Sequence, residues 1–74
     1  MNPSQDQILF VSFCVEMYAR RHGCSGEAVM RLFSEYGVCE FLVESYDPLH
    51  SVDREEILDE IEVFMKGRKS HGEH

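Results

Sequence analysis

Residues 8–18, with the sequence ILFVSFCVEMY, are the part of this 74-residue chain that most limits how it can fold. Nine of these 11 residues are apolar, and Ser12 and Glu16 are the only interruptions. A chain of this length buries only about 60% of the surface that its unfolded form exposes, so few residues are left to cover such a segment. The segment is also shorter than the roughly 20 apolar residues that cross a bilayer. We therefore expect it at the centre of a small folded domain and not in a membrane.

Serine and glycine residues mark the ends of the first two predicted helices. Ser4 stands where an N-cap is needed, and Gly23 can end the helix that follows it. Ser25 and Gly37 bracket the next apolar stretch in the same way. The two predicted helices cover residues 5–22 and 26–36.

Proline and glycine also limit the two remaining predicted helices. The third helix should end before Pro48, because a residue that precedes a proline avoids helical angles. The fourth should begin at Asp53, with Ser51 as a rival cap, and end at Gly67. These limits predict helices over residues 38–46 and 53–66, a turn over 47–51, a single helical domain over 1–67 and a flexible polar tail over 68–74.

The first predicted helix has a narrow polar stripe and a wide apolar arc. The stripe contains Ser12, Glu16 and Arg20, whereas the remaining residues of the apolar segment spread over about 220° of the helix surface. Each of the other helices has one apolar side. We therefore predict a small all-α domain, similar to a four-helix bundle, packed around the hydrophobic N-terminal helix. Truncation of Phe13 or Val11 to alanine should then cost about 2–5 kcal/mol of stability.

Gly37 joins the second and third helices so tightly that they cannot both lie along the whole first helix. Two outcomes remain open for the apolar arc of the first helix. Either the other helices cover it completely, or part of it stays uncovered as a groove. An uncovered part would be a surface for a partner or for self-association.

The formal charge of −7 is concentrated in one part of the chain. Residues 38–62 contain nine of the 14 acidic residues, and Arg54 is their only lysine or arginine. Such a region repels phosphate backbones, so direct nucleic-acid binding is not expected, but it can attract a protein with a basic surface. The simpler alternative is that these charges only keep a small helical protein soluble.

Three cysteines, an odd number, favour free thiols over a disulfide framework. Cys14 and Cys39 lie among apolar residues, which is typical of reduced thiols in a core. The apolar segment lacks the basic region before it and the small-residue cleavage site after it that a secretory signal has. These features predict a cytoplasmic protein.

The chain shows no residue pattern typical of an enzyme or of a metal site. His22 and Cys24 are not followed by a second ligand pair at zinc-like spacing. Residues 55–60 offer several carboxylates, but a solvated helix face does not tune a carboxylate as an acid. We therefore expect no catalytic residue, no cofactor and no bound metal. His50 should instead hydrogen-bond a backbone carbonyl and fix the turn in which it lies.

Five short stretches of the chain carry a family resemblance: FCVEMY at residues 13–18, SGEAV at 25–29, LFSEYGV at 32–38, LHS at 49–51 and DEI at 59–61. Together they resemble a family of short bacterial proteins, domain-of-unknown-function family 3791, over about residues 8–66. The resemblance implies a small helical accessory protein. Many members are encoded beside, or fused to, ADP-ribosyltransferase-like proteins, which implies a toxin–antitoxin or immunity-like arrangement. It supplies no catalytic residues.

These observations predict a non-catalytic protein-interaction module, an antitoxin-like or immunity-like regulator of a neighbouring ADP-ribosyltransferase-like protein. Its partner would be a toxin-like protein with a basic surface. Two alternatives stay open: a homodimeric structural protein, and an acidic inhibitor that mimics nucleic acid. The candidate partner-binding residues are Glu40, Glu44, Glu55, Asp59, Glu62 and Val63.

Overall fold

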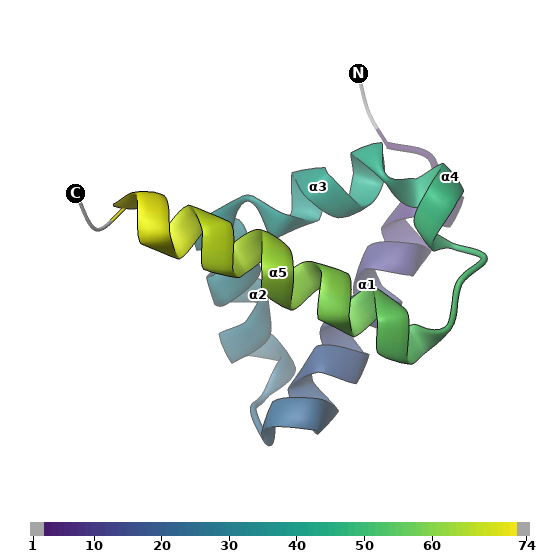
Figure 1. The fold of residues 1–74 in the computed structure, drawn as a ribbon. Coiled ribbons are helices and arrows are strands. Elements are labelled where there is room, and N and C mark those ends of the chain that lie inside the picture. The colour runs from purple at the N-terminus through teal and green to yellow at the C-terminus, as the bar shows by residue number, and fades with distance from the viewer. Residues whose placement is uncertain (1–2, 73–74) are drawn as a thin grey trace.

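The computed structural model describes residues 3–72, with side chains described as far as Arg68, and it confirms the all-α fold. The described residues form five helices and contain no strand (Figure 1). Their bounds are α1 Gln5–His22, α2 Gly26–Tyr36, α3 Val38–Glu44, α4 Tyr46–Leu49 and α5 Arg54–Gly72. None of them combines the length and the hydropathy that a membrane span requires.

The predicted bounds of α1 and α2 are confirmed, and the local signals act as expected. The Ser4 hydroxyl accepts a hydrogen bond from the Gln7 backbone N–H, and the Gln7 side chain accepts one from the Ser4 N–H, which completes a capping box. Ser25 caps α2 by accepting from the Ala28 N–H. Gly23 and Gly37 end the two helices with φ of 64° and 72°, a backbone region that glycine adopts without strain.

The prediction that the third helix runs to Tyr46 and ends because of Pro48 is wrong. The helix ends earlier, at Glu44, and Pro48 lies inside the short helix α4. Pro48 is tolerated there because the first residues of a helix have no intrahelical partner for their N–H groups. The predicted turn over residues 47–51 is therefore helical in its first part, and the fold has one more helix than expected.

The prediction that Gly67 ends the last helix is wrong, because α5 continues to Gly72. Glycine inside a helix costs about 1 kcal/mol relative to alanine, but it does not force the helix to end. Residues 68–72 of the predicted tail therefore belong to α5, residues 73–74 lie outside the described residues, and the flexibility of the tail stays a prediction. At the other end, α5 begins directly after Asp53, whose carbonyl accepts from the Ile57 N–H.

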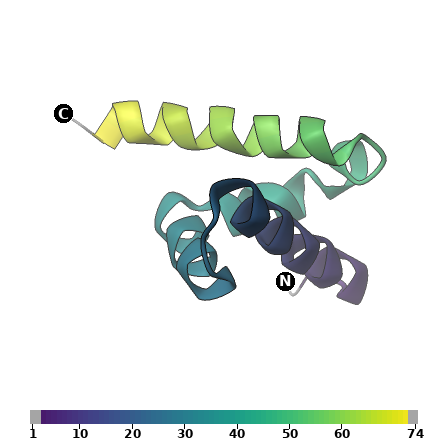
Figure 2. The ribbon, with the colours of Figure 1, turned by 90° about the horizontal axis from the view of Figure 1, so that it is seen from below.

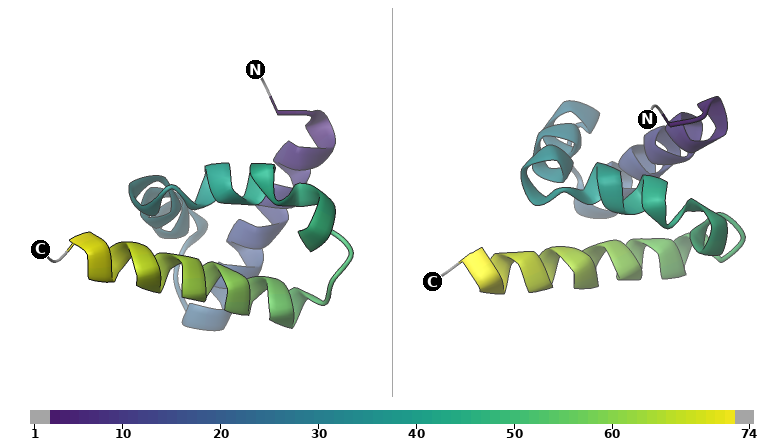
Figure 3. Two further views of the ribbon diagram at one scale, coloured as in Figure 1. Left: turned by 45° about the horizontal axis from the view of Figure 1, so that its top comes forward. Right: turned by 90° about the horizontal axis from the view of Figure 1, so that it is seen from above.

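The helices enclose one core, and α5 lies along one side of it (Figure 2). α3 lies next to α5, whereas α1 and α2 diverge from their short connection on the opposite side (Figure 3). The largest fully buried side chains come from four of the helices, α1, α2, α3 and α5: Cys14, Val29, Phe33, Val38, Leu42 and Ile61. Stacking of Phe41 on Phe64, with ring centroids 4.3 Å apart, adds an aromatic contact between α3 and α5.

The apolar arc of α1 is only partly covered. Val15 is buried and Val11 is half-buried, but Phe13 keeps 45% of its surface exposed, and Ile8 and Leu9 are also exposed. The alternative in which part of the arc stays uncovered is therefore confirmed. The expectation that Phe13 contributes like a core residue is wrong, because α2 and α3 do not extend over that side of α1.

The difference between Phe13 and Phe33 predicts unequal effects of the same substitution. Phe33→Ala empties a fully buried site in α2 and should reduce the free energy of unfolding by about 3–5 kcal/mol. Phe13→Ala should cost only about 1 kcal/mol, since much of that ring already contacts solvent. Urea unfolding of the two variants measures the difference, and equal losses would contradict the exposure of Phe13.

Two glycine substitutions test the corrected end of α5 and the role of Gly37 at the end of α2. Gly67→Ala should stabilise the protein by about 0.5–1 kcal/mol, because the glycine is helical and an added Cβ meets no atom within 4 Å. Gly37→Ala should destabilise it by about 1–2 kcal/mol, because Gly37 has a left-handed φ of 72°. Thermal unfolding checks both expectations. Destabilisation by Gly67→Ala would instead indicate that the helix ends at Gly67.

Candidate interaction surface

Arg21, in the last turn of α1, binds three of the six residues predicted to contact a partner. Its guanidinium lies 3.0 Å from the Glu55 carboxylate, 3.2 Å from that of Asp59 and 3.3 Å from that of Glu62. The three acids lie on one face of α5 because their spacing of four and three residues matches the helical repeat. This cluster joins the C-terminal end of α1 to α5 across 34 to 41 positions of sequence.

The neighbouring His22 contacts the same cluster and lowers the pKa of one acid. Its Nε2 donates to the Glu62 carboxylate over 2.9 Å. The pKa of Glu62 lies below its ordinary value chiefly because His22 hydrogen-bonds the carboxylate; burial opposes this effect, and the Arg21 hydrogen bond adds to it. The hydrogen bonds from Arg21 to Asp59 and Glu62 in turn raise the pKa of the guanidinium. The cluster is therefore a contact between α1 and α5 at the surface of the protein, with Glu55 and Asp59 mostly exposed.

The other predicted contact residues lie elsewhere. Glu40 and Glu44 are exposed on α3, where they line a hollow of about 440 Å³ that Pro3 and Val43 also border. Val63 lies on α5 and is 65% exposed. The structure thus gathers Glu55, Asp59 and Glu62 around Arg21 but leaves Glu40 and Glu44 on a different helix. Whether any of the six contacts a partner stays a prediction.

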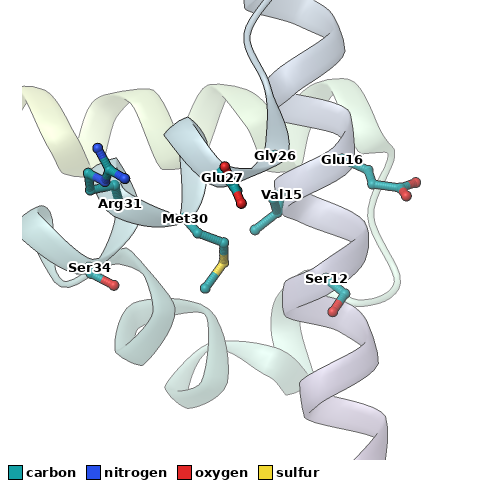
Figure 4. Close-up of a pocket in the computed structure, with 8 residues that line it drawn as sticks. All are labelled: Ser12, Val15, Glu16, Gly26, Glu27, Met30, Arg31 and Ser34. Carbon is teal, nitrogen blue, oxygen red and sulfur yellow. The ribbon is translucent and has the colours of Figure 1, made fainter.

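A groove of about 680 Å³ opens between α1 and α2. Figure 4 shows Val15 of α1 and Met30 of α2 entering the space between the two helices, while α5 passes behind it. Gly26 lies at the closed end of the groove, near the connection of the helices. A Cβ added there would lie 4.0 Å from Val15 Cγ1, so α2 packs closely on α1 at this point. The groove thus has helical walls and a mixed lining, in which Met30 and Val15 are the large apolar side chains among polar ones.

The charged residues of the groove differ in where they point. Figure 4 shows Glu27 between the two helices at the closed end, whereas Glu16 extends away from α2 and Arg31 away from α1. Among the side chains of residues 3–68, Glu27 makes no ion pair. The carboxylate of Glu27 therefore lies in the groove, at its closed end.

Sequence reasoning did not identify Met30 as an exposed residue. Met30 is 43% exposed, whereas Val29 and Phe33 of the same helix are buried. The signal was present, because a position is rotated about 100° from its neighbour on a helix. This rotation places Met30 at the edge of the apolar side, beside Glu27 and Ser34. The angle at which α1 and α2 diverge had no comparable signal.

His50 and the cysteines behave as the sequence predicted. The Nδ1 atom of His50 donates a hydrogen bond of 2.8 Å to the Tyr46 carbonyl oxygen, and the rings of the two residues stack. This contact fixes the turn after α4. The three cysteines are free; burial raises the pKa of Cys14 to about 12, and burial together with Glu40 raises that of Cys39.

Residues 9–68 match the model of a protein family described as "Protein of unknown function (DUF3791)". The chain belongs to this family. The match includes α2, α3 and α4 and most of α1 and α5, so the groove and the Arg21 cluster both lie in the part that defines DUF3791. No curated protein and no solved structure matches the chain.

The lowered pKa of Glu62 predicts a loss of stability in acid. A carboxylate whose pKa is lower in the folded state stabilises the fold above its unfolded pKa, ordinarily 4.5, and this contribution disappears as the pH falls through the lowered pKa. Urea unfolding between about pH 7 and pH 3 should show this decline, and Glu62→Gln should flatten it. Glu60→Gln, on another face of α5, should keep the original pH dependence; an unchanged slope in Glu62→Gln would exclude the cluster as its source.

Proposed function

We propose that this chain is a non-catalytic protein-interaction module. The observation that carries the proposal is the set of large apolar side chains that the fold leaves in contact with solvent on α1 and α2. Ile8, Leu9 and Phe13 lie within two turns of α1, and Met30 lies on α2. Several large apolar side chains exposed on so small a domain favour an interaction site, because a partner that covers them removes apolar area from water.

The class of partner rests on the family resemblance together with the charge of the chain. The resemblance favours a bacterial antitoxin-like or immunity-like protein that regulates a neighbouring ADP-ribosyltransferase-like protein, and the free cysteines favour a cytoplasmic location. The formal charge of −7 favours a partner with a basic surface, since opposite charges accelerate encounter. In this proposal Glu40 and Glu44, which are exposed on α3, attract the partner, and so does Val63 through its apolar contact.

A homodimer is a second candidate, because the same exposed apolar residues can meet in two copies of the chain. A stable dimer typically buries about 800 Å² on each partner. The solvent-accessible surface of this chain is 5383 Å², so an interface of that size would occupy a considerable part of it. Inhibition by nucleic-acid mimicry stays a prediction from the acidic composition alone.

Co-expression with the neighbouring ADP-ribosyltransferase-like protein tests the proposed function. We expect the two proteins to co-purify, and Leu9→Asp should reduce the recovered complex by at least about tenfold, because it places a charge in the apolar contact. Gln5→Asp is the matched control, since it adds the same charge one turn earlier without removing an apolar side chain.

Light scattering of the purified chain separates the possible outcomes. A monomer that co-purifies with the neighbouring protein supports the proposal. A chain that elutes alone as a dimer establishes the homodimer instead. A chain that elutes alone as a monomer overturns both candidates.

A further inference from the structure

We propose that the groove between α1 and α2 binds an amphipathic helix of the partner, with a lysine or arginine of that helix placed against Glu27. This inference rests on the proposed function and adds the site and the chemistry of the recognised segment. The acidic residues picked from the sequence contribute attraction at a distance, but they do not form this docking site.

The shape of the groove suits a helical segment. Its walls are two helices that diverge from one end. Met30 supplies exposed apolar surface from one wall, and the largely buried Val15 lies opposite it on the other (Figure 4). A third helix laid along such a groove can insert its own apolar residues between them, which is a recurring mode of peptide recognition. Methionine suits this role because its flexible side chain adapts to the shape of its partner.

Charge decides which kind of helix fits. Glu27 lies between the walls at the closed end and makes no ion pair among the described side chains, whereas Arg31 points away from α1 (Figure 4). A cation beside the apolar stripe of the incoming helix would pair with Glu27. The formal charge of −7 also favours a basic segment over a second copy of this chain, since two such copies repel each other.

The Arg21 cluster shows the same pairing within the chain. There, one guanidinium meets Glu55, Asp59 and Glu62, and this contact holds α1 against α5. Because those three acids already face an internal cation, an incoming cation would have to compete with Arg21 to reach them. Glu27 requires no such exchange, which favours the groove over the acidic face of α5.

Two synthetic helical peptides of about 15 residues test the inference on the complete chain. Both are alanine-rich with leucines on one face; the first has lysines beside the leucines, and the second has glutamates in their place. We expect the lysine peptide to bind at least about tenfold more tightly at low salt, because its cations meet Glu27 and the acidic chain. In NMR spectra, its addition should shift the amide signals of Val15, Gly26 and Met30 most strongly.

Matched substitutions locate the site. Met30→Asp should weaken binding of the lysine peptide by at least about tenfold, whereas Ala28→Asp, which adds the same charge at an exposed position of α2 outside the groove, should not. Glu27→Lys should weaken it by about three- to tenfold at low salt and by less at high salt, whereas Glu35→Lys, outside the groove on the same helix, should have a smaller effect. Circular dichroism of each variant confirms that the helices are retained.

Several results would overturn the inference. They are equal affinity for the two peptides, amide shifts centred on α5, and loss of binding with Ala28→Asp but not with Met30→Asp. A dimer of the free chain that dissociates on Met30→Asp would assign the groove to a second copy. If the neighbouring protein co-purifies equally well with Met30→Asp, the proposed function stands and only the groove is excluded. If no neighbouring protein co-purifies at all, the proposed function itself fails.

Discussion

Gly37 imposes the constraint on which the arrangement of the helices depends, because it is the whole connection between α2 and α3. Its N–H donates to the carbonyls of Phe33 and Ser34 at the end of α2, and its own carbonyl accepts from the Phe41 N–H at the start of α3. Both sets of bonds require its φ of 72°. A single residue therefore fixes the angle between two helices, and the chain cannot lay both along the same side of α1.

The uncovered surface follows from that constraint and from the small size of the chain. α3 leaves α2 at Gly37 and reaches the beginning of α1, where the Gln7 side chain donates to the Val43 carbonyl over 3.3 Å. α1 and α2 are held together at their connection but diverge beyond it, which opens the groove on the side away from α5 (Figure 3). Since α5 already buries its apolar side, including Ile61, in the core, no described element is left to cover Leu9, Phe13 and Met30.

The sequence predicted the parts of this fold that local chemistry decides. The caps at Ser4 and Ser25 and the glycine at position 37 need only near neighbours, so their effects could be foreseen. Gly67 could not be read in the same way, because glycine is tolerated both inside a helix and at its end, and the surrounding structure decides which occurs. The Arg21 cluster could not be predicted from the sequence either. The spacing of the acids placed them on one face of α5, but only the packing of α1 on α5 identifies the cation opposite them.

The negative charge of the chain and the apolar contacts of the groove have different effects on recognition. Arg21 compensates part of the acidic face of α5, but the chain as a whole keeps its formal charge of −7. Exposed charges of this kind act over about a Debye length, roughly 8 Å at physiological salt, and mainly raise the rate at which a basic partner arrives. Retention of that partner depends instead on desolvated apolar contacts, such as those that Val15 and Met30 offer. Under the proposed function, salt should therefore slow the association of the complex far more than it speeds its dissociation, because attraction arises from the whole acidic surface and retention arises from the groove.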